Sequence, residues 1–309
     1  MKQVWMYAAL LAAVMTGCSD KETDGVGDIR EIRVGAKVTG TVETKAPVTT
    51  GSMFTAGIAA IENASAAPSS AMDWGTPQWT NSVTLTAQEQ IMGNRVPLNV
   101  LKVYPQTGYV HLVAWYPNLP AVGGVVSFAR TGTEDVMYGG IVSGSATNPV
   151  GAFGFTHALT QLNFQVQATD RYLNDNPGKQ ISAIEVIGAS YPQSMQIATG
   201  AVTYAATADL PVPGFSPITL STNLVAAGVP FMVDALNAVS IRVHYSDDTQ
   251  SDPIAIINAA TNLPLNAEAG KSHQITLTFQ KQGEVAIQGT ATVAPWEVGA
   301  SGNGSVVQP

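Results

Sequence analysis

The sequence predicts an all-β fold, organised as two tandem β-sandwich domains that follow an N-terminal signal peptide for export. Three observations support this fold class. Short runs with an apolar residue at every second position recur along the chain, turn-rich pieces separate them, and convincing amphipathic helices are scarce. Many short strands at this spacing favour sandwiches over a parallel α/β sheet.

The first expected strand has the clearest alternation in the chain. Its apolar positions are Ile32, Val34, Ala36, Val38 and Val42, and charged or polar residues occupy most positions between them. Further strands are expected at 83–86, 96–103, 109–115, 162–166, 181–187, 231–233, 239–245, 273–279 and 285–293. Residues 221–227 and 258–262 are the places where single helical turns are expected.

A domain boundary is expected between about residues 148 and 154, where small and turn-forming residues interrupt the strand pattern. We place it so that residues 29–152 form an N-terminal β-sandwich and residues 153–309 form a C-terminal β-sandwich of comparable size.

The N-terminus has the pattern of a lipoprotein leader. Lys2 is followed by an apolar stretch, 4–14, that is too short to span a bilayer. Residues 15–18 read MTGC and resemble a lipobox, so residues 1–17 are expected to be a signal peptide and Cys18 the site of lipid attachment. The alternative is an ordinary signal peptide with a chance cysteine. Residues 18–28 are polar and are expected to form a tether.

The composition limits the possible functions. Only 12% of residues are charged and the net charge is −8, with no cluster of basic residues in the sequence, which argues against nucleic-acid binding. No nucleophile elbow, phosphate loop or zinc motif is present. The four histidines are far apart and are expected to be strand residues, so we expect no metal, no cofactor and no enzyme. A carboxylate pair that meets only in the fold stays open as an alternative.

Four segments form a series along the chain. Residues 44–46 read TKA and precede MFTAGI at 53–58; residues 110–117 read VHLVAWYP; residues 155–164 read FTHALTQLNF; and residues 269–273 read AGKSH before a strand. Together with the lipobox, this series resembles the fimbrillin family, the subunits of type V pili in Gram-negative anaerobes. Lys45 stands where family members often have arginine.

The resemblance implies two transthyretin-like sandwiches and a way to polymerise. In that family a trypsin-like protease removes the first strand, and a strand of another subunit fills the groove, which is donor-strand exchange. Here it implies cleavage between Lys45 and Ala46 and displacement of the strand that carries Ile32, Val34, Ala36, Val38 and Val42. The alternative is that this strand is permanent and that Lys45 is a plain loop cation.

The C-terminal tail is a poor donor strand. Residues 299–304 have linker composition and only Val306 and Val307 are apolar after them. We therefore expect a tip, accessory or minor subunit rather than the main stalk subunit. The resemblance also implies other fimbrillin-like subunits as partners. It implies a cell-surface location on the outer membrane, where acyl chains such as palmitate on Cys18 would hold the protein.

Two tryptophans offer an alternative function. Trp74 and Trp79 lie in a polar stretch, and sugars stack on exposed indole rings, although packing over the edge of a sandwich is the simpler role. The runner-up is thus a non-polymerising glycan-binding surface lipoprotein, and an envelope enzyme on a β-scaffold comes third. The receptor or glycan itself is unknown from the sequence.

Overall fold

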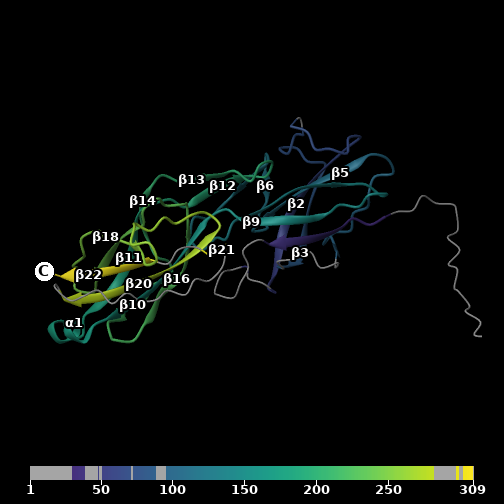
Figure 1. Ribbon diagram of the computed structural model, residues 1–309. Coiled ribbons are helices and arrows are strands. Elements are labelled where there is room, and N and C mark those ends of the chain that lie inside the picture. The colour runs from purple at the N-terminus through teal and green to yellow at the C-terminus, as the bar shows by residue number, and fades with distance from the viewer. Residues whose placement is uncertain are drawn as a thin grey trace, which may run out of the picture.

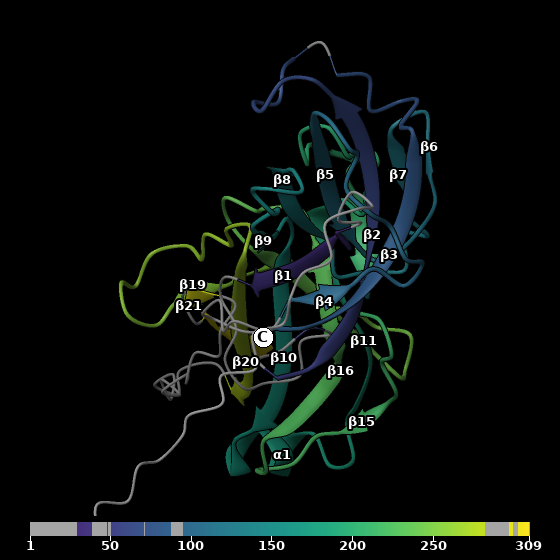
Figure 2. The same cartoon turned by 90° about the vertical axis from the view of Figure 1, so that its right-hand side faces the viewer.

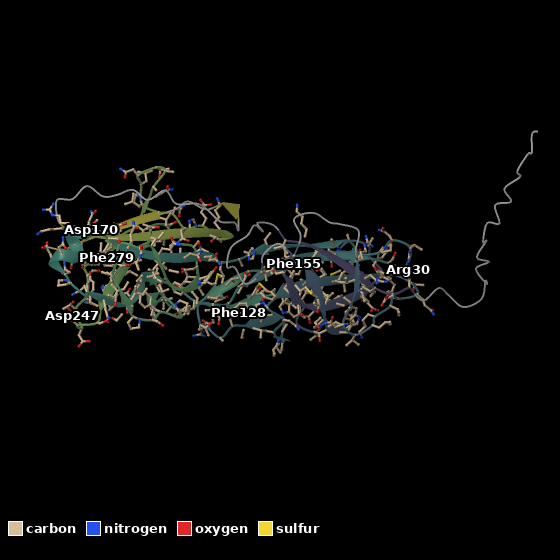
Figure 3. All side chains as sticks on the ribbon, turned by 90° about the horizontal axis from the view of Figure 1, so that it is seen from below. Arg30, Phe128, Phe155, Asp170, Asp247 and Phe279 are labelled. Atoms are coloured by element: carbon tan, nitrogen blue, oxygen red, sulfur yellow. The ribbon has the colours of Figure 1, made fainter. Side chains whose placement is uncertain are left out.

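The computed structural model describes residues 30–38, 48, 51–70, 72–87 and 95–281, together with the backbone of residues 297–298 and 302–308. Nearly all regular structure in these ranges is β-strand, so the predicted all-β class is confirmed. The molecule is elongated (Figure 1), and Arg30 lies at one end and Asp170 at the other (Figure 3).

A seven-stranded sheet forms the N-terminal part, in the order β3-β2-β5-β8-β9-β1-β4. Its strands are β1 (Arg33–Val38), β2 (Met53–Asn63), β3 (Trp79–Thr86), β4 (Val96–Pro97), β5 (Tyr109–Tyr116), β8 (Met137–Gly144) and β9 (Ala152–His157). The backbone N–H of Asn99, just after β4, donates to the carbonyl of Ser82 in β3 at 2.9 Å, so the two edges of the sheet meet. The curled sheet encloses one apolar core.

Two sheets form the C-terminal part. One has the order β16-β10-β20-β22-β19 with β21 beside β20, and the other has the order β14-β11-β17-β18 with β15 beside β11. The strands of the first are β10 (Thr160–Ala168), β16 (Val225–Val233), β19 (Ile257–Asn258), β20 (Lys271–Lys281), β21 (Glu297–Val298) and β22 (Gly302–Gln308). Those of the second are β11 (Gln180–Ala189), β14 (Ala208–Pro211), β15 (Ile218–Thr219), β17 (Ser240–Tyr245) and β18 (Ile254–Ala255). Alternate apolar residues of β10, β11 and β17 share one core, which makes this part a sandwich.

A small fourth sheet joins the two parts. Its order is β13-β12-β7-β6, with β6 (Ala121–Val122) and β7 (Val125–Ser127) from the N-terminal part and β12 (Pro192–Gln196) and β13 (Val202–Tyr204) from the C-terminal part. Met195 lies opposite Val126 across β12 and β7. A third apolar core, which includes Trp115, Val126, Met195 and Met232, lies beneath this sheet. The predicted boundary at residues 152–153 stays a prediction; β9 spans it and pairs with β1 and β8.

One of the two helical expectations needs correction, whereas residues 258–262 do form a single turn, in which the N–H of Asn262 donates to the carbonyl of Asn258 at 2.8 Å. Residues 225–227, inside the stretch expected to hold a helical turn, belong to β16, where Ala227 is buried in the core opposite Phe164. The helix that the structure describes is α1 (Asp170–Asp175), which the strand pattern did not reveal. Thr169 caps it by accepting a hydrogen bond from the N–H of Tyr172 at 3.2 Å. No helix in the described ranges is long and apolar enough to cross a bilayer.

Candidate functional site: the seat of the first strand

The first strand lies between two neighbours that come from later parts of the chain. β1 pairs in parallel with β9, with Ala36 opposite Phe153 and Val38 opposite Phe155, and in antiparallel fashion with β4, with Val34 opposite Val96. Figure 2 shows β1 between β9 and β4. Four register pairs join it to β9 and two join it to β4. The seat of β1 is therefore a groove lined by residues far apart in the sequence.

The side chains of this strand alternate as the sequence predicts. Ile32, Val34 and Val38 are fully buried and Ala36 is 9% exposed, all in the core that contains Phe153 and Phe155. The side chains of Arg33 and Lys37 are exposed. The period-two prediction is thus confirmed for residues 32–38, and displacement of the strand stays a prediction.

Burial of this apolar row is a large part of what holds the N-terminal core together. Each fully buried valine or isoleucine contributes about 1.5–3 kcal/mol relative to exposure. The three in β1 and its approach therefore contribute roughly 5–9 kcal/mol, a sum comparable with the 5–15 kcal/mol that stabilises a typical domain. An empty seat would be unstable, so any process that removed β1 would have to refill the groove with another apolar strand.

The approach to the seat is fastened by three contacts. The backbone N–H of Tyr104 donates to the carbonyl of Arg30 at 2.9 Å, and the Arg30 guanidinium donates to the carbonyl of Ala146 at 2.7 Å. The N–H of Val150 donates to the phenol oxygen of Tyr104 at 2.8 Å. Burial raises the pKa of this phenol, which therefore stays neutral.

Other residues implicated by the sequence lie outside the described residues. These are Cys18, Val42, Lys45 and Ala46, and their expected roles in lipid attachment, strand displacement and cleavage stay predictions.

The two candidate tryptophans have different environments. Trp74 is only 5% exposed and packs in the core beneath the joining sheet, so its ring is not presented at the surface. Trp79 is half-buried; its indole N–H donates to Oε1 of Glu62 at 3.0 Å, and Nζ of Lys102 lies 5.1 Å from the centre of its ring. Trp79 is partly exposed and packs against the N-terminal core, so its role as a glycan contact stays a prediction, whereas Trp74 is a core residue.

The four histidines are dispersed over the fold. His111 is buried in β5, where its Nδ1 lies 2.7 Å from the hydroxyl of Ser143 and its Nε2 lies 3.0 Å from the carbonyl of Ser65. Burial lowers the pKa of His111. Nε2 faces a carbonyl and must donate, so Nδ1 accepts from Ser143. In the described part of the chain, no three His, Cys, Asp or Glu residues gather as metal ligands would.

One buried ionisable pair was not apparent from the sequence. Nδ1 of His157 lies 2.7 Å from Oδ1 of Asp135, and both side chains are almost fully buried, at 1% and 0% exposure. His157 ends β9, directly before the C-terminal part begins. A histidine and an aspartate 22 positions apart carry no spacing signal, and only the approach of the β7–β8 connection to β9 brings them together.

The C-terminal tail differs from its expected linker character. Residues 302–308 form β22, which pairs in parallel with β20 over seven register pairs, from Ile275 opposite Gly302 to Lys281 opposite Gln308. β22 also pairs with β19. Glycine and serine have little strand preference, so pairing with a buried neighbour, rather than local propensity, accounts for this strand.

Comparison with known proteins agrees with this architecture. The family model described as fimbrillin-like matches residues 44–296. The structure of a candidate cell adhesion protein from Bacteroides uniformis is 19% identical, with a TM-score of 0.50 over 80% of this chain and 92% of that chain. A candidate polysaccharide-binding protein from Bacteroides thetaiotaomicron is 11% identical, with a TM-score of 0.46 over 84% of this chain and 94% of that one. No curated protein matches the sequence.

Proposed function

Because the chain belongs to the fimbrillin-like family, we propose that it is a structural and adhesive subunit of a bacterial surface fimbria. It is exported by residues 1–17 and acylated at Cys18, so that it first stands on the outer membrane at the cell surface. Its partners are other fimbrillin-like subunits and a trypsin-like processing protease. Adhesion requires no reaction, and the protein acts through its surfaces rather than as an enzyme.

The observation that carries this proposal is the position of β1. The strand is near the start of the chain, its apolar side chains fill the N-terminal core, and Arg30 before it lies at one end of the molecule (Figure 3). β22 lies near the opposite end, beside β20 (Figure 1). A groove at one end and a strand at the other are the two parts that linear, head-to-tail assembly requires.

In the proposed maturation, the protease cuts between Lys45 and Ala46 and the segment that carries Ile32, Val34, Ala36, Val38 and Val42 leaves. A strand of a neighbouring subunit then takes its place. Backbone hydrogen bonds to β9 and β4 hold the new strand, and alternate apolar side chains fill the vacated pockets and define the register.

A terminal or accessory position in the fimbria fits this chain better than the main stalk. A donor strand must place apolar side chains at alternate positions on one face. Val306 and Val307 are adjacent, so each face of a donor made from this tail would carry one valine. The tail would also have to leave its seven register pairs with β20. We therefore propose that the chain accepts a strand more readily than it donates one, as a tip, accessory or minor subunit does.

Digestion with a lysine-specific protease tests the proposal. We expect early cleavage that gives a new N-terminus at Ala46, detected by N-terminal sequencing, while the cut strand stays bound in its place and the protein stays folded by circular dichroism. Lys45→Gln should block this cut, and Lys37→Gln, on β1 itself, should leave it unchanged. Added peptide with the sequence of residues 32–42 should bind only the cleaved protein. Cleavage elsewhere first, or unfolding of the product, would overturn the proposal.

Trp79 gives a second function a specific basis. Trp79 is partly exposed and has Lys102 and Glu62 beside its indole, which is why a non-polymerising glycan-binding lipoprotein is the alternative. Binding on a glycan array that Trp79→Ala removes and Trp74→Phe retains would favour that alternative, because Trp74 is a core residue.

A further inference from the structure

Four basic side chains from separate segments gather at the end of the molecule where Arg30 lies. These residues, Arg30, Arg33, Arg95 and Lys102, are here called the basic pole. The backbone N–H of Ile32 donates to the carbonyl of Lys102 at 2.8 Å, and Arg33 lies opposite Pro97, two residues after Arg95. Arg30 and Arg95 are both close enough to Tyr104 to lower the pKa of its phenol, in opposition to burial, which raises it.

The charge of this pole is opposite to that of the whole chain. Among the described residues, two carboxylates are in contact with this group, one directly and one through an indole ring. Glu31 is 3.7 Å from Arg33, and Glu62 bonds the indole that lies under Lys102. The balance of these six described residues is thus +2, in a chain of net charge −8. The sequence shows no basic cluster, because the fold assembles this one from residues 30–33 and 95–102.

An apolar loop lies within the same region. Residues 98–103, here called the Val100 loop, include Val100, Leu101 and Val103, which are 64%, 65% and 37% exposed. Exposed apolar side chains are common when scattered singly, but here three lie within four residues of one loop. They flank Lys102, whose carbonyl accepts the N–H of Ile32 just before β1.

The Val100 loop is held in place rather than loose. Asn81 of β3 clamps Val100, since its Nδ2 donates to the Val100 carbonyl at 2.6 Å and its Oδ1 accepts from the Val100 N–H at 3.1 Å. Asn99 adds two hydrogen bonds to Ser82, one from its backbone and one from its side chain. The fold therefore keeps these apolar side chains outside at a fixed position, although their burial would be favourable.

We propose that the basic pole and the Val100 loop form a docking surface for an anionic lipid membrane. Aliphatic side chains enter the boundary between headgroups and acyl chains, and the surrounding arginines and lysine contact lipid phosphates. A lipid surface is favoured over a protein partner because the chain before Arg30 runs to Cys18, the proposed site of lipid attachment. Arg30 is separated from Cys18 by eleven residues, which span at most about 40 Å when fully extended. The inference rests on the proposed lipid anchor, which would bring this end of the molecule to the membrane.

The surface acts in the uncut protein, before the cut after Lys45 removes Arg30, Arg33 and Cys18, and it would orient the protein rather than anchor it. Each basic residue near an anionic surface strengthens binding about five-fold, and the effect fades within a Debye length of about 10 Å at 0.1 M salt. Contact through the pole would hold the elongated molecule upright, with α1 and β22 directed away from the membrane (Figure 1).

The test uses the chain from Ser19 to Pro309, which keeps every described residue and lacks the leader and Cys18. We expect it to sediment with phosphatidylcholine vesicles that contain phosphatidylglycerol and not with phosphatidylcholine alone, and we expect added salt to weaken the binding. Lys102→Gln should lower the partition coefficient about five-fold. Leu101→Ser should lower it about ten-fold, because the leucine no longer enters the apolar boundary.

Two variants elsewhere serve as matched controls. Arg130→Gln removes a cation from an exposed loop in the middle of the molecule, and Leu263→Ser removes a leucine that is 62% exposed. Neither should change vesicle binding. Equal losses in the pole and control variants, or equal binding to neutral vesicles, would overturn the proposal.

The remaining outcomes separate this proposal from the proposed function. Light scattering that shows self-association, abolished by Leu101→Ser, without vesicle binding would assign the pole to a neighbouring subunit and overturn the lipid surface. Failure to bind vesicles, together with an acyl group on Cys18 by mass spectrometry and clean cleavage after Lys45, would remove the docking surface alone. An absent acyl group with vesicle binding intact would remove the anchor instead.

Discussion

The two parts of the molecule share one pattern of strand pairing but differ in the length of the paired segment. In each, an early strand pairs in parallel with a late one: β1 with β9 in the N-terminal part, and β10 with β20 in the C-terminal part. The first pairing has four register pairs and the second has eight. One topology thus occurs twice in the chain, with a short ladder in one copy and a long one in the other.

The side chains on the outer faces of these pairings differ as well. On β1, the outward residues Arg33 and Lys37 are exposed. On β10 and β20 the outward residues are neutral and bond across the ladder: Ser272 donates to Oε1 of Gln161 at 2.6 Å, and Gln167 donates to the hydroxyl of Thr278 at 3.2 Å. The first strand of the C-terminal part is locked by backbone and side chains, whereas β1 is held chiefly by its apolar row. The comparison indicates where the molecule would open.

Shortening one buried side chain in each core should give the largest difference between the two parts. Phe279 is fully buried and lies 5.8 Å from Tyr172 and 6.4 Å from Tyr245, measured between ring centres. We expect Phe279→Ala to lower the free energy of unfolding by about 3–5 kcal/mol in urea titrations. Val34→Ala should lower it by about 2 kcal/mol and also speed amide exchange at residues 152–155 selectively. Uniform exchange in both variants would contradict the idea that β1 opens first.

A glycine at the junction tests whether the two parts unfold together. Gly200 has φ +73°, and a Cβ there would lie 2.5 Å from the ring of Tyr138 in β8. Gly200→Ala should lower the free energy of unfolding by about 2–4 kcal/mol through backbone strain and overlap. Gly123→Ala, with φ +57° and nothing within 4 Å, should cost only about 1–2 kcal/mol. If calorimetry of Gly200→Ala shows two unfolding transitions, the two parts need the close packing of Gly200 on Tyr138 to unfold together, and the strand pairing of the joining sheet is not sufficient.

The polar ladder of the C-terminal part should have a smaller effect. Ser272 is buried, donates to Gln161 and accepts from Nδ2 of Asn163 at 3.0 Å. Ser272→Ala should cost about 1–3 kcal/mol, because two amide groups lose a partner. Thr203→Ala, at an exposed position of β13, should leave stability unchanged. Equal unfolding midpoints for the two variants would show that the ladder does not lock β10.

Acid should weaken the N-terminal part before the C-terminal part. Burial lowers the folded-state pKa of His111, so the unfolded chain binds more protons as pH falls through 6.5, the ordinary value, and stability is lost there. Asp247, in the C-terminal part, stabilises the fold in its charged form, because hydrogen bonds from Lys179 and Thr249 lower its pKa to about 2. Its contribution to stability is therefore present at neutral pH and is lost only as pH falls below about 3.8, the ordinary value. Thermal unfolding between pH 7 and 5 should show the decline, and His111→Gln should flatten it. A slope that survives this substitution would assign it to another group.

The strand pattern was readable because it depends on local order. The alternation at positions 32–38 predicts that Ile32, Val34, Ala36 and Val38 are buried, and in the structure these side chains are buried. Similar patterns marked β5, β10, β11, β17 and β20. Of the expected 96–103 strand, Val96 and Pro97 pair as β4 and Val103 forms an isolated antiparallel bridge with Glu31, because Asn81 clamps the chain between them out of the ladder. The expected strand at 285–293 lies outside the described residues.

What the sequence by itself determined is therefore the all-β class, the apolar row of the first strand and the series of motifs that resembles the fimbrillins. Only the tertiary structure decided which strands and residues meet: β1 with β9, β7 with β12, Asp135 with His157, and Ile32 with Lys102 of the Val100 loop. The physical reason is that a period of two specifies the buried face of a strand and nothing about its neighbours. Pairing is selected by the packing of whole sheets, over separations at which sequence spacing carries no signal.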